Sequence, residues 1–463
     1  MKEATVEQLR TLLTRGETTS VELIERYWKA IQTHEPSLNA FIDLNHEAFS
    51  EARALDIERH TTGVRSPLHG IPVVIKDNIL SAGSMRTTVN SRVFKDFFAP
   101  FDAHLVTRLR EAGAIILGKT TLSEFAYYMS KTTMPSGYGS LSGQTVSAYD
   151  KTLDPLGSST GSAVAVSADM APIGIGTETN GSLMSPAINN SLVSLKPTVG
   201  LVSRHGIFPI SSSQDTAGPL SKTVACSAAL LDVIAGYDPA DAASLQKPAT
   251  SYEEALSRDL HGMRVGALVF KDHTLSDAQI TAFDEAKAVL REAGAEIVKI
   301  EHTYDIPNNT HILSPEMNRD MNRFLSALPN APVKTFRELT QANRSESHLN
   351  LKHAQGLFLD ALGSDMRLKD ARYLDAKLKT KAAVDGFNAL YGAHGVDVII
   401  SPHYQPYAAV GGTPSMVVPA SSLLKGSPLS IMFAAPALQE FPLIKVAYAY
   451  EQGTKHRRPP KLL

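Results

Sequence analysis

The chain has 463 residues, of which 43% are hydrophobic and 20% charged, and its formal net charge at pH 7 is −2. This composition predicts a globular protein with a large core, and the near-zero charge argues against nucleic-acid or acidic-membrane binding as its function. The single cysteine, Cys226, excludes an internal disulfide framework. No run approaches the roughly 20 apolar residues of a membrane-spanning helix. Because the first residues are charged and amphipathic, we expect no secretory signal and a cytoplasmic protein.

Helix-like and strand-like segments alternate along most of the chain. The apolar spacing predicts helices over 3–14 and 20–34, with Pro36 ending the second helix. Further strands are expected at 38–42, 73–75, 114–117, 171–176, 264–269 and 296–300, with helices at about 46–59, 102–112 and 277–292. This order favours an α/β fold in which helices cover a mixed or parallel sheet.

The segment 310–390 is charged and poor in strand signals, which indicates a helical subregion. The strand pattern returns at 396–402, and a strand pair is expected at 416–419 and 429–432 before a last helix over 440–452. There is no internal repeat and no low-complexity linker, so we interpret residues 1–463 as a single domain.

Two short motifs suggest functions that their surroundings do not support. Residues 113–120, GAIILGKT, match the phosphate-loop pattern, but the four residues between its glycines are an apolar strand rather than a loop with exposed amides. Residues 157–161, GSSTG, match the nucleophile elbow of hydrolases, but the preceding segment contains Pro155 and is a poor strand. The 15 histidines are scattered without metal-ligand spacing, so no metal is expected.

A lysine at a strand end and two hydroxyl-rich clusters form a more promising set. Lys76 follows the strand 73–75, and the clusters occupy 157–162 and 177–182. A buried neutral lysine can deprotonate a serine, a second serine can relay the proton, and the amides before Ser182 can receive an oxyanion. Each residue also has a structural interpretation: Lys76 as an ordinary strand-end lysine, and the serines as helix caps.

Three ordered blocks resemble the amidase signature family, namely GIPVVIKDN at 70–78, GSSTGSA at 157–163 and GTETNGS at 176–182. The segments LKPT at 195–198 and VAYAYEQ at 446–452 are similar to that family too. The resemblance covers most of the chain, while the helical middle matches loosely. It implies the amidase signature fold, in which a large mixed β-sheet is covered by helices on both faces.

The resemblance also implies roles for individual residues and a reaction without a cofactor. Ser182 would be the nucleophile, Lys76 the general base, and Ser158 the bridging serine after a cis peptide bond from Gly157. The separation of 24 residues between the two serines selects Ser158 over Ser159. The oxyanion donors would be the backbone N–H groups of Thr179, Asn180, Gly181 and Ser182.

This sequence departs from the family pattern at four positions. Thr160 and Asn180 stand where glycine is common, and Glu178 replaces aspartate with its charge kept. Asparagine tolerates left-handed backbone angles, so we expect Asn180 to be acceptable. Met184 stands where arginine is frequent. Because methionine cannot pair with a carboxylate, we interpret Met184 as a substrate-binding position that disfavours substrates with a carboxylate near the scissile amide.

The runs at 177–182, 198–204 and 213–219 look closest to the peptide amidase branch, whose members remove C-terminal amides from peptides and release ammonia. We therefore expect a serine amidohydrolase, active as a monomer or homodimer on a small-molecule or peptide amide. The alternatives are an A-type amidotransferase subunit that needs partner chains, an esterase or aryl-amide hydrolase, and a scaffold without turnover. The acyl pocket is expected to come from 310–390 and from loops near 125–150.

Overall fold

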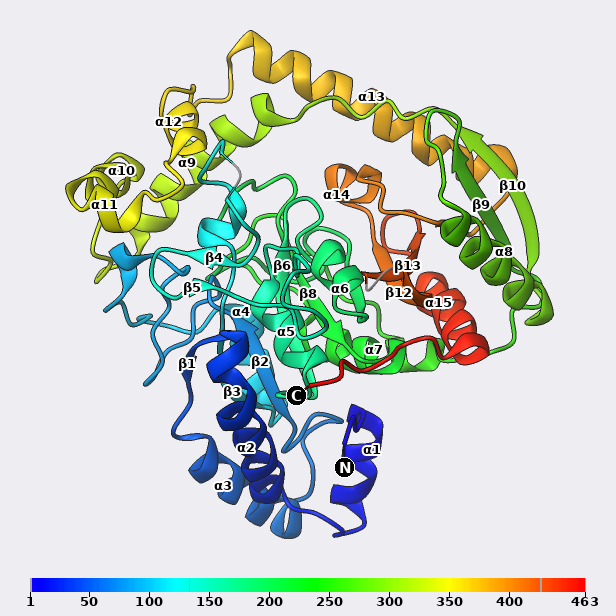
Figure 1. Cartoon of the computed structure of the whole chain (residues 1–463), viewed down its shortest axis with the longest axis horizontal. Helices are drawn as coiled ribbons and strands as arrows, with labels where there is room; N and C mark the ends of the chain where they lie inside the picture. The colour runs from blue at the N-terminus through cyan, green and yellow to red at the C-terminus, as the bar shows by residue number, and fades with distance from the viewer. Residues whose placement is uncertain (1, 133, 425–426, 463) are drawn as a thin grey trace.

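The computed structural model describes residues 2–132, 134–424 and 427–462, and a mixed sheet of 11 strands runs through this part of the chain (Figure 1). The strand order is β1-β3-β2-β6-β8-β7-β12-β13-β11-β9-β10. Strand β2 runs parallel to β3 and β6, and β9 runs parallel to β10 and β11, whereas the remaining pairs are antiparallel. The strands are β1 (Phe41–Leu44), β2 (Pro72–Lys76), β3 (Ile115–Thr120), β6 (Ile173–Glu178), β7 (Val193–Lys196), β8 (Thr216–Ser221), β9 (Arg264–Phe270), β10 (Glu296–His302), β11 (Val398–Ser401), β12 (Ser415–Leu424) and β13 (Ser427–Ala434), with a separate short pair β4 (Tyr138–Gly139) and β5 (Gly143–Gln144).

Helices cover both faces of this sheet. Helices α4, α7, α15 and α8 contact one another in that order and cover one face, whereas α5 and α6 pack together on the other. The helices are α1 (Val6–Thr14), α2 (Ser20–Leu38), α3 (Ala48–Thr61), α4 (His104–Glu111), α5 (Thr160–Ser167), α6 (Met184–Asn189), α7 (Val224–Ile234), α8 (Asp277–Glu292), α9 (Thr310–Ala327), α10 (Phe336–Ser345), α11 (Ser347–Asn350), α12 (Gly356–Leu362), α13 (Ala371–His394), α14 (Tyr407–Gly411) and α15 (Glu440–Thr454). The predicted α/β architecture is confirmed, and its sheet is mixed. None of the helices in the described part of the chain combines the length and apolarity that crossing a bilayer requires.

The segment 310–390 is helical, as its composition predicts, and contains α9 to α12 and most of α13. Figure 1 shows α10, α11 and α12 grouped at one end of the molecule, with α13 running along the outer edge toward β10. Helix α9 packs against α10, α12 and α13 and is the centre of this group. The assignment of all 463 residues to one domain stays a prediction.

The expectation that Pro36 ends the second helix is wrong. Helix α2 begins with a capping box between Thr19 and Glu22 and continues through Pro36 to Leu38. Asn39 then ends it in the left-handed conformation, with φ of 51°. Proline removes one donor and clashes with the preceding turn, but here it lies only two residues before the helix ends. The left-handed Asn39 is therefore the signal that terminates the helix.

Helix α5 approaches β6 closely because small residues line both elements. All eight residues of α5 are buried, and none is larger than valine. Opposite them, a Cβ atom at Gly176 would lie 2.6 Å from Ser159 Oγ and 2.7 Å from Ser159 Cβ, distances too short for any side chain. The small residues of this stretch thus permit the contact between the start of α5 and the strand that leads to Ser182.

Candidate active site

Lys76 ends β2, the third strand from one edge of the sheet, and its side chain is fully buried. The Nζ atom lies 2.8 Å from Ser158 Oγ, 3.0 Å from Ser159 Oγ and 2.9 Å from Thr177 Oγ1, and 3.3 Å from the Thr177 carbonyl oxygen. Among the residues that the structure describes, no carboxylate forms an ion pair with it. Burial without a close counter-charge disfavours the ammonium form and lowers the pKa of Lys76 from 10.5 to about 7, although Glu178 and Asp215 act in the opposite direction.

The two serines next to Lys76 differ in where their protons can go. Ser159 Oγ donates to the Thr177 carbonyl oxygen at 3.0 Å and accepts from the Thr177 N–H at 3.2 Å, so toward Lys76 it can only accept. Ser158 Oγ has no acceptor other than Lys76 Nζ among the described residues. A neutral Lys76 can therefore take the Ser158 proton on its lone pair. The peptide bond between Gly157 and Ser158 is cis, as the family resemblance implies.

Neither Ser158 nor Ser182 caps a helix, although helix capping was the structural interpretation of both serines. Helix α5 begins at Thr160 after Ser159, whose side chain makes no capping hydrogen bond. Helix α6 begins at Met184, and the Glu178 carboxylate accepts the N–H groups at its start: its Oε2 lies 2.7 Å from the Leu183 nitrogen and 3.1 Å from the Met184 nitrogen. Glu178 thereby anchors the turn that presents the half-buried Ser182, whose carbonyl oxygen accepts from the Ser159 N–H at 3.2 Å.

The backbone of 179–182 is arranged with its amides free. The Thr179 carbonyl oxygen accepts from Gln214 Nε2 at 3.1 Å, and the Gly181 carbonyl oxygen accepts from the Ser185 N–H at 2.7 Å. Because the peptide unit is planar, the N–H groups of the following residues, Asn180 and Ser182, point the opposite way. Within the described residues, none of the four N–H groups from 179 to 182 has a hydrogen-bond acceptor. Unpaired amides beside a hydroxyl suit a developing oxyanion.

The glycine of this turn, not the asparagine, adopts the left-handed conformation. Gly181 has φ of +79°, whereas the φ of Asn180 is not positive. The expectation that asparagine is acceptable at position 180 because it tolerates a left-handed backbone is therefore wrong, since residue 180 does not adopt that conformation. Its side chain makes a specific contact instead, since Tyr404 donates its hydroxyl to Asn180 Oδ1 at 2.6 Å. The sequence offered no signal for Tyr404, which lies 224 residues away.

Ser182 opens onto a cavity of about 370 Å³. A second cavity of about 350 Å³ contains Thr177, Glu178 and Phe324 in its lining. The two cavities share three lining residues, Ala126, Thr179 and Ile210. Helix α9 supplies lining residues to both cavities, and Ala126, Tyr127, Tyr128 and Ser136 line the cavity that contains Ser182. The segments expected to build the pocket, 310–390 and 125–150, therefore both contribute to these cavities.

Met184 does not occupy a substrate-binding position in this structure. Its side chain is fully buried, and it lines neither cavity. The sulfur lies 3.9 Å from the hydroxyl of Ser415 on β12, on the sheet side of α6. The interpretation of Met184 as a substrate contact is corrected accordingly, because the first turn of α6 directs this side chain into the core.

The phosphate-loop alternative finds no support in the geometry. Lys119 of the phosphate-loop match is fully buried in β3, donates to the Ile79 carbonyl at 2.6 Å and to Thr87 Oγ1 at 2.8 Å, and pairs with Asp77 at 3.2 Å. The Lys119 side chain therefore interacts with groups inside the core and does not reach a phosphate site at the surface. The described ranges contain no group of three or more His, Cys, Asp or Glu side chains placed to hold a metal ion.

With this geometry in view, comparison with known proteins identifies the family. A family model described as Amidase matches residues 22–409. The chain belongs to the amidase signature family. A probable amidase of Arabidopsis thaliana is 35% identical over 100% of this chain and 92% of its own length. The A-type subunit of the glutamyl-tRNA(Gln) amidotransferase of Synechococcus elongatus is 33% identical over 99% of this chain and 100% of its own.

Solved peptide amidase structures are also similar to this enzyme. The native peptide amidase of Stenotrophomonas maltophilia is 37% identical with a TM-score of 0.92, covering 100% of this chain and 99% of that one. A peptide amidase in complex with the competitive inhibitor chymostatin has the same identity and TM-score and covers 99% of each chain. The protein is thus an amidase-family enzyme that acts on amide bonds.

Proposed function

We propose that this enzyme is a cofactor-free serine amidohydrolase that removes the C-terminal amide of peptides. The observation that carries the mechanism is the 2.8 Å contact between Lys76 Nζ and Ser158 Oγ, in a buried site where the pKa of Lys76 is about 7 because of desolvation. A lysine in that environment is neutral often enough near neutral pH to act as a base.

The reaction is a two-stage acyl transfer. Ser182 Oγ attacks the amide carbonyl, its proton passes to Ser158, and the Ser158 proton passes to Lys76. The new C–O bond leaves the negative charge on the carbonyl oxygen, which the free amides at 179–182 receive. When the C–N bond breaks, the nitrogen takes the proton back from Lys76 through Ser158 and leaves as ammonia. Water then attacks the acyl-enzyme by the same relay, which releases the carboxylic acid and restores Ser182.

Peptide amides are the substrate class that the comparisons favour. The solved peptide amidases cover nearly all of this chain at 37% identity, and one of them binds the inhibitor chymostatin. The cavity at Ser182 has a volume of about 370 Å³, which fits the size of small-molecule sites. A second cavity of about 350 Å³ next to it offers room for a further substituent of the substrate.

An ammonia-release screen tests this function. Peptide amides, aryl amides and fatty amides are offered to the wild-type chain, to Ser182→Ala and to Ser185→Ala. Ser185 is the matched control, since it lines the same cavity three residues further along and its hydroxyl makes no hydrogen bond with a described residue. We expect peptide amides to be the preferred class, Ser182→Ala to be inactive and Ser185→Ala to keep most of its rate. A wild-type rate in Ser182→Ala would refute the mechanism, and a preference for aryl or fatty amides would refute the substrate class.

An A-type amidotransferase subunit is the second candidate. The observation in its favour is the 33% identity to such a chain over 99% of this one. That function needs partner chains, so the discriminating measurement is the rate of the purified chain alone. Efficient release of ammonia from peptide amides without partners would favour the peptide amidase, and a rate that appears only with a partner would favour the amidotransferase.

A further inference from the structure

The loop 210–215 lies against the turn that carries Ser182, and a half-buried carboxylate of the loop itself, Asp215, holds it in shape. Asp215 Oδ2 accepts the N–H groups of Ile210 and Ser211, each at 2.8 Å. Asp215 Oδ1 accepts the hydroxyl of Thr179 at 2.5 Å. Since the carbonyl oxygen of Thr179 is bound by Gln214 at 3.1 Å, this loop holds Thr179 through both its side chain and its backbone.

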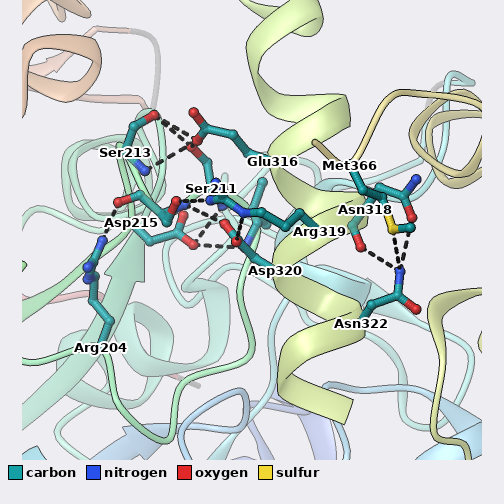
Figure 2. A network of polar contacts seen from close by, with 12 residues as sticks. Arg204, Ser211, Ser213, Asp215, Glu316, Asn318, Arg319, Asp320, Asn322 and Met366 are labelled. Carbon is teal, nitrogen blue, oxygen red and sulfur yellow. Dashed lines mark hydrogen bonds and ion pairs between the residues drawn. The ribbon is translucent and has the colours of Figure 1, made fainter. Parts of the chain in front are cut away.

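Helix α9 holds the same loop from the other side, as Figure 2 shows. Asp320 Oδ2 accepts the Ser212 N–H at 2.9 Å. Glu316, one turn earlier on α9, accepts the Ser211 hydroxyl at 2.5 Å, the Ser213 hydroxyl at 2.7 Å and the Ser213 N–H at 3.2 Å, all on Oε2. Carboxylates therefore accept all the N–H groups of 210 to 213, and the two buried ones, Glu316 and Asp320, belong to α9.

Glu316 accepts more hydrogen bonds in this network than Asp215 or Asp320 does. Its side chain is 2% exposed, and its Oε1 accepts the Tyr373 hydroxyl at 2.9 Å in addition to the three loop donors on Oε2. A carboxylate offers acceptors only, on both oxygens, whereas glutamine would turn an N–H₂ group toward one set of donors. Loss of the carboxylate would leave buried loop donors unpaired, which costs about 1–3 kcal/mol for each group.

The same helix lines both cavities of the site. Leu313 lies in the wall of the cavity that contains Ser182, and Arg323 and Phe324 lie in the wall of the second cavity. Helix α9 is thus in position to contact a substrate and to hold the loop that fixes the Thr179–Asn180 peptide plane.

We infer that Glu316 is a positioning residue for the oxyanion amides, acting through the loop 210–215 and Thr179. It touches neither the reacting atoms nor Ser182. Its loss lets the 210–215 loop relax, which turns the Asn180 N–H away from the carbonyl oxygen and weakens stabilisation of the tetrahedral intermediate. Because this role rests on the proposed function, its test uses a reaction of Ser182 that needs no peptide amide.

The test is the second-order rate of Ser182 labelling by a fluorophosphonate, whose phosphoryl oxygen develops negative charge as the serine attacks. We expect Glu316→Gln to label roughly 10- to 100-fold more slowly than the wild type, a fraction of the effect of removing an oxyanion donor outright. Tyr373→Phe is the matched control, because it removes a partner of Glu316 on the side away from the loop, and it should label within about twofold of the wild type. With a peptide amide, Glu316→Gln should lower kcat and change KM by less than about twofold.

The outcomes distinguish a failure of the proposed substrate class from a failure of the positioning role of Glu316. A wild-type chain that labels but hydrolyses no peptide amide contradicts the proposed substrate class and leaves the labelling comparison valid. A folded Glu316→Gln that labels at the wild-type rate, or in which KM rises and kcat is kept, overturns the positioning role. If Glu316→Gln does not fold, Ser213→Ala decides, since it removes one loop donor and keeps the Glu316 carboxylate with its other partners. A loss of about threefold in its labelling rate is expected, and an unchanged rate overturns the inference.

Discussion

The rate of the enzyme should depend on pH through Lys76, with an acid limb centred near pH 7. Burial without a close counter-charge lowers the pKa of Lys76 from 10.5 to about 7. The difference corresponds to about 5 kcal/mol in favour of the neutral amine. At pH 7 about half of the enzyme then carries a neutral lysine, against roughly 0.03% for a lysine of ordinary pKa, a gain of about 10³-fold in competent base. Below pH 7 the rate should fall tenfold for each pH unit, and above it the rate should level off.

Two assays follow the same ionisation. The first is kcat/KM for ammonia release from a peptide amide between pH 5.5 and 9.5, and the second is the rate of fluorophosphonate labelling over the same range. We expect the midpoints of both pH profiles to fall between about pH 6 and pH 8. Lys76→Met should lose most of the rate in both assays, and its remaining rate should show no acid limb. A midpoint above pH 9 would refute the reasoning, since it would mean that the buried lysine keeps its proton. A limb near pH 7 that persists in Lys76→Met would assign the ionisation to another group.

The same pKa predicts a stability difference with a definite sign. Between pH 7 and 10.5 the unfolded chain binds more protons at Lys76 than the folded chain, so the contribution of Lys76 to stability increases as pH rises through that window. From pH 7 to pH 9 the gain should be about 2 kcal/mol. Urea unfolding at the two pH values measures it as the difference between the wild type and Lys76→Met, which removes the effects of all other groups. A difference that shrinks with rising pH would contradict the lowered pKa.

Two further substitutions test separate parts of the structure. Ser158→Ala should lower kcat by roughly 10²- to 10⁴-fold and Ser159→Ala by less. The reason is that only the Ser158 hydroxyl has Lys76 as its sole acceptor among the described residues. A larger loss of kcat in Ser159→Ala than in Ser158→Ala would contradict the relay. Asp77→Asn should lower the free energy of unfolding by about 3–5 kcal/mol, because it leaves the buried Lys119 ammonium without its counter-charge. Urea unfolding checks this, with Asp385→Asn on an exposed ion pair of α13 as the control expected to change little.

Much of the site follows from short stretches of sequence, because its chemistry is concentrated at strand ends. The β-branched run before Lys76 predicts a buried strand, and β2 ends at that residue. The cluster around Ser182 reaches Lys76 because β2 pairs with β6, a parallel neighbour that the β–helix–β pattern anticipates. The cluster around Ser158 reaches the same place because it precedes α5, which packs against β6. The choice of Ser158 over Ser159 rests on family spacing, and both hydroxyls lie within 3.0 Å of Lys76 Nζ.

The misses share one cause, which is that sequence does not give side-chain direction or distant contacts. The neighbours of Met184 in the sequence suggest a substrate contact, yet the turn of α6 sends this side chain into the core. Asp215 carries no local signal for its role, although it binds Thr179 from 36 residues away. Glu316 lies in the segment that matches the family least and reaches Ser211 across 105 residues. No local pattern encodes contacts of this range.

The wide separation in sequence of the groups around Lys76 has a consequence for how the protein folds. Lys76 and Ser158 are 82 residues apart, and Lys76 and Thr177 are 101 residues apart, so the basic group acquires its partners only after β2 and β6 have paired. Contacts between segments this far apart form more slowly than local helices do, so we expect the site to assemble after the helices. Nascent chains that have made only local helices would therefore be catalytically silent. The fraction of molecules in which Ser182 reacts would then measure the fraction of correctly folded protein in a preparation, including after refolding from denaturant.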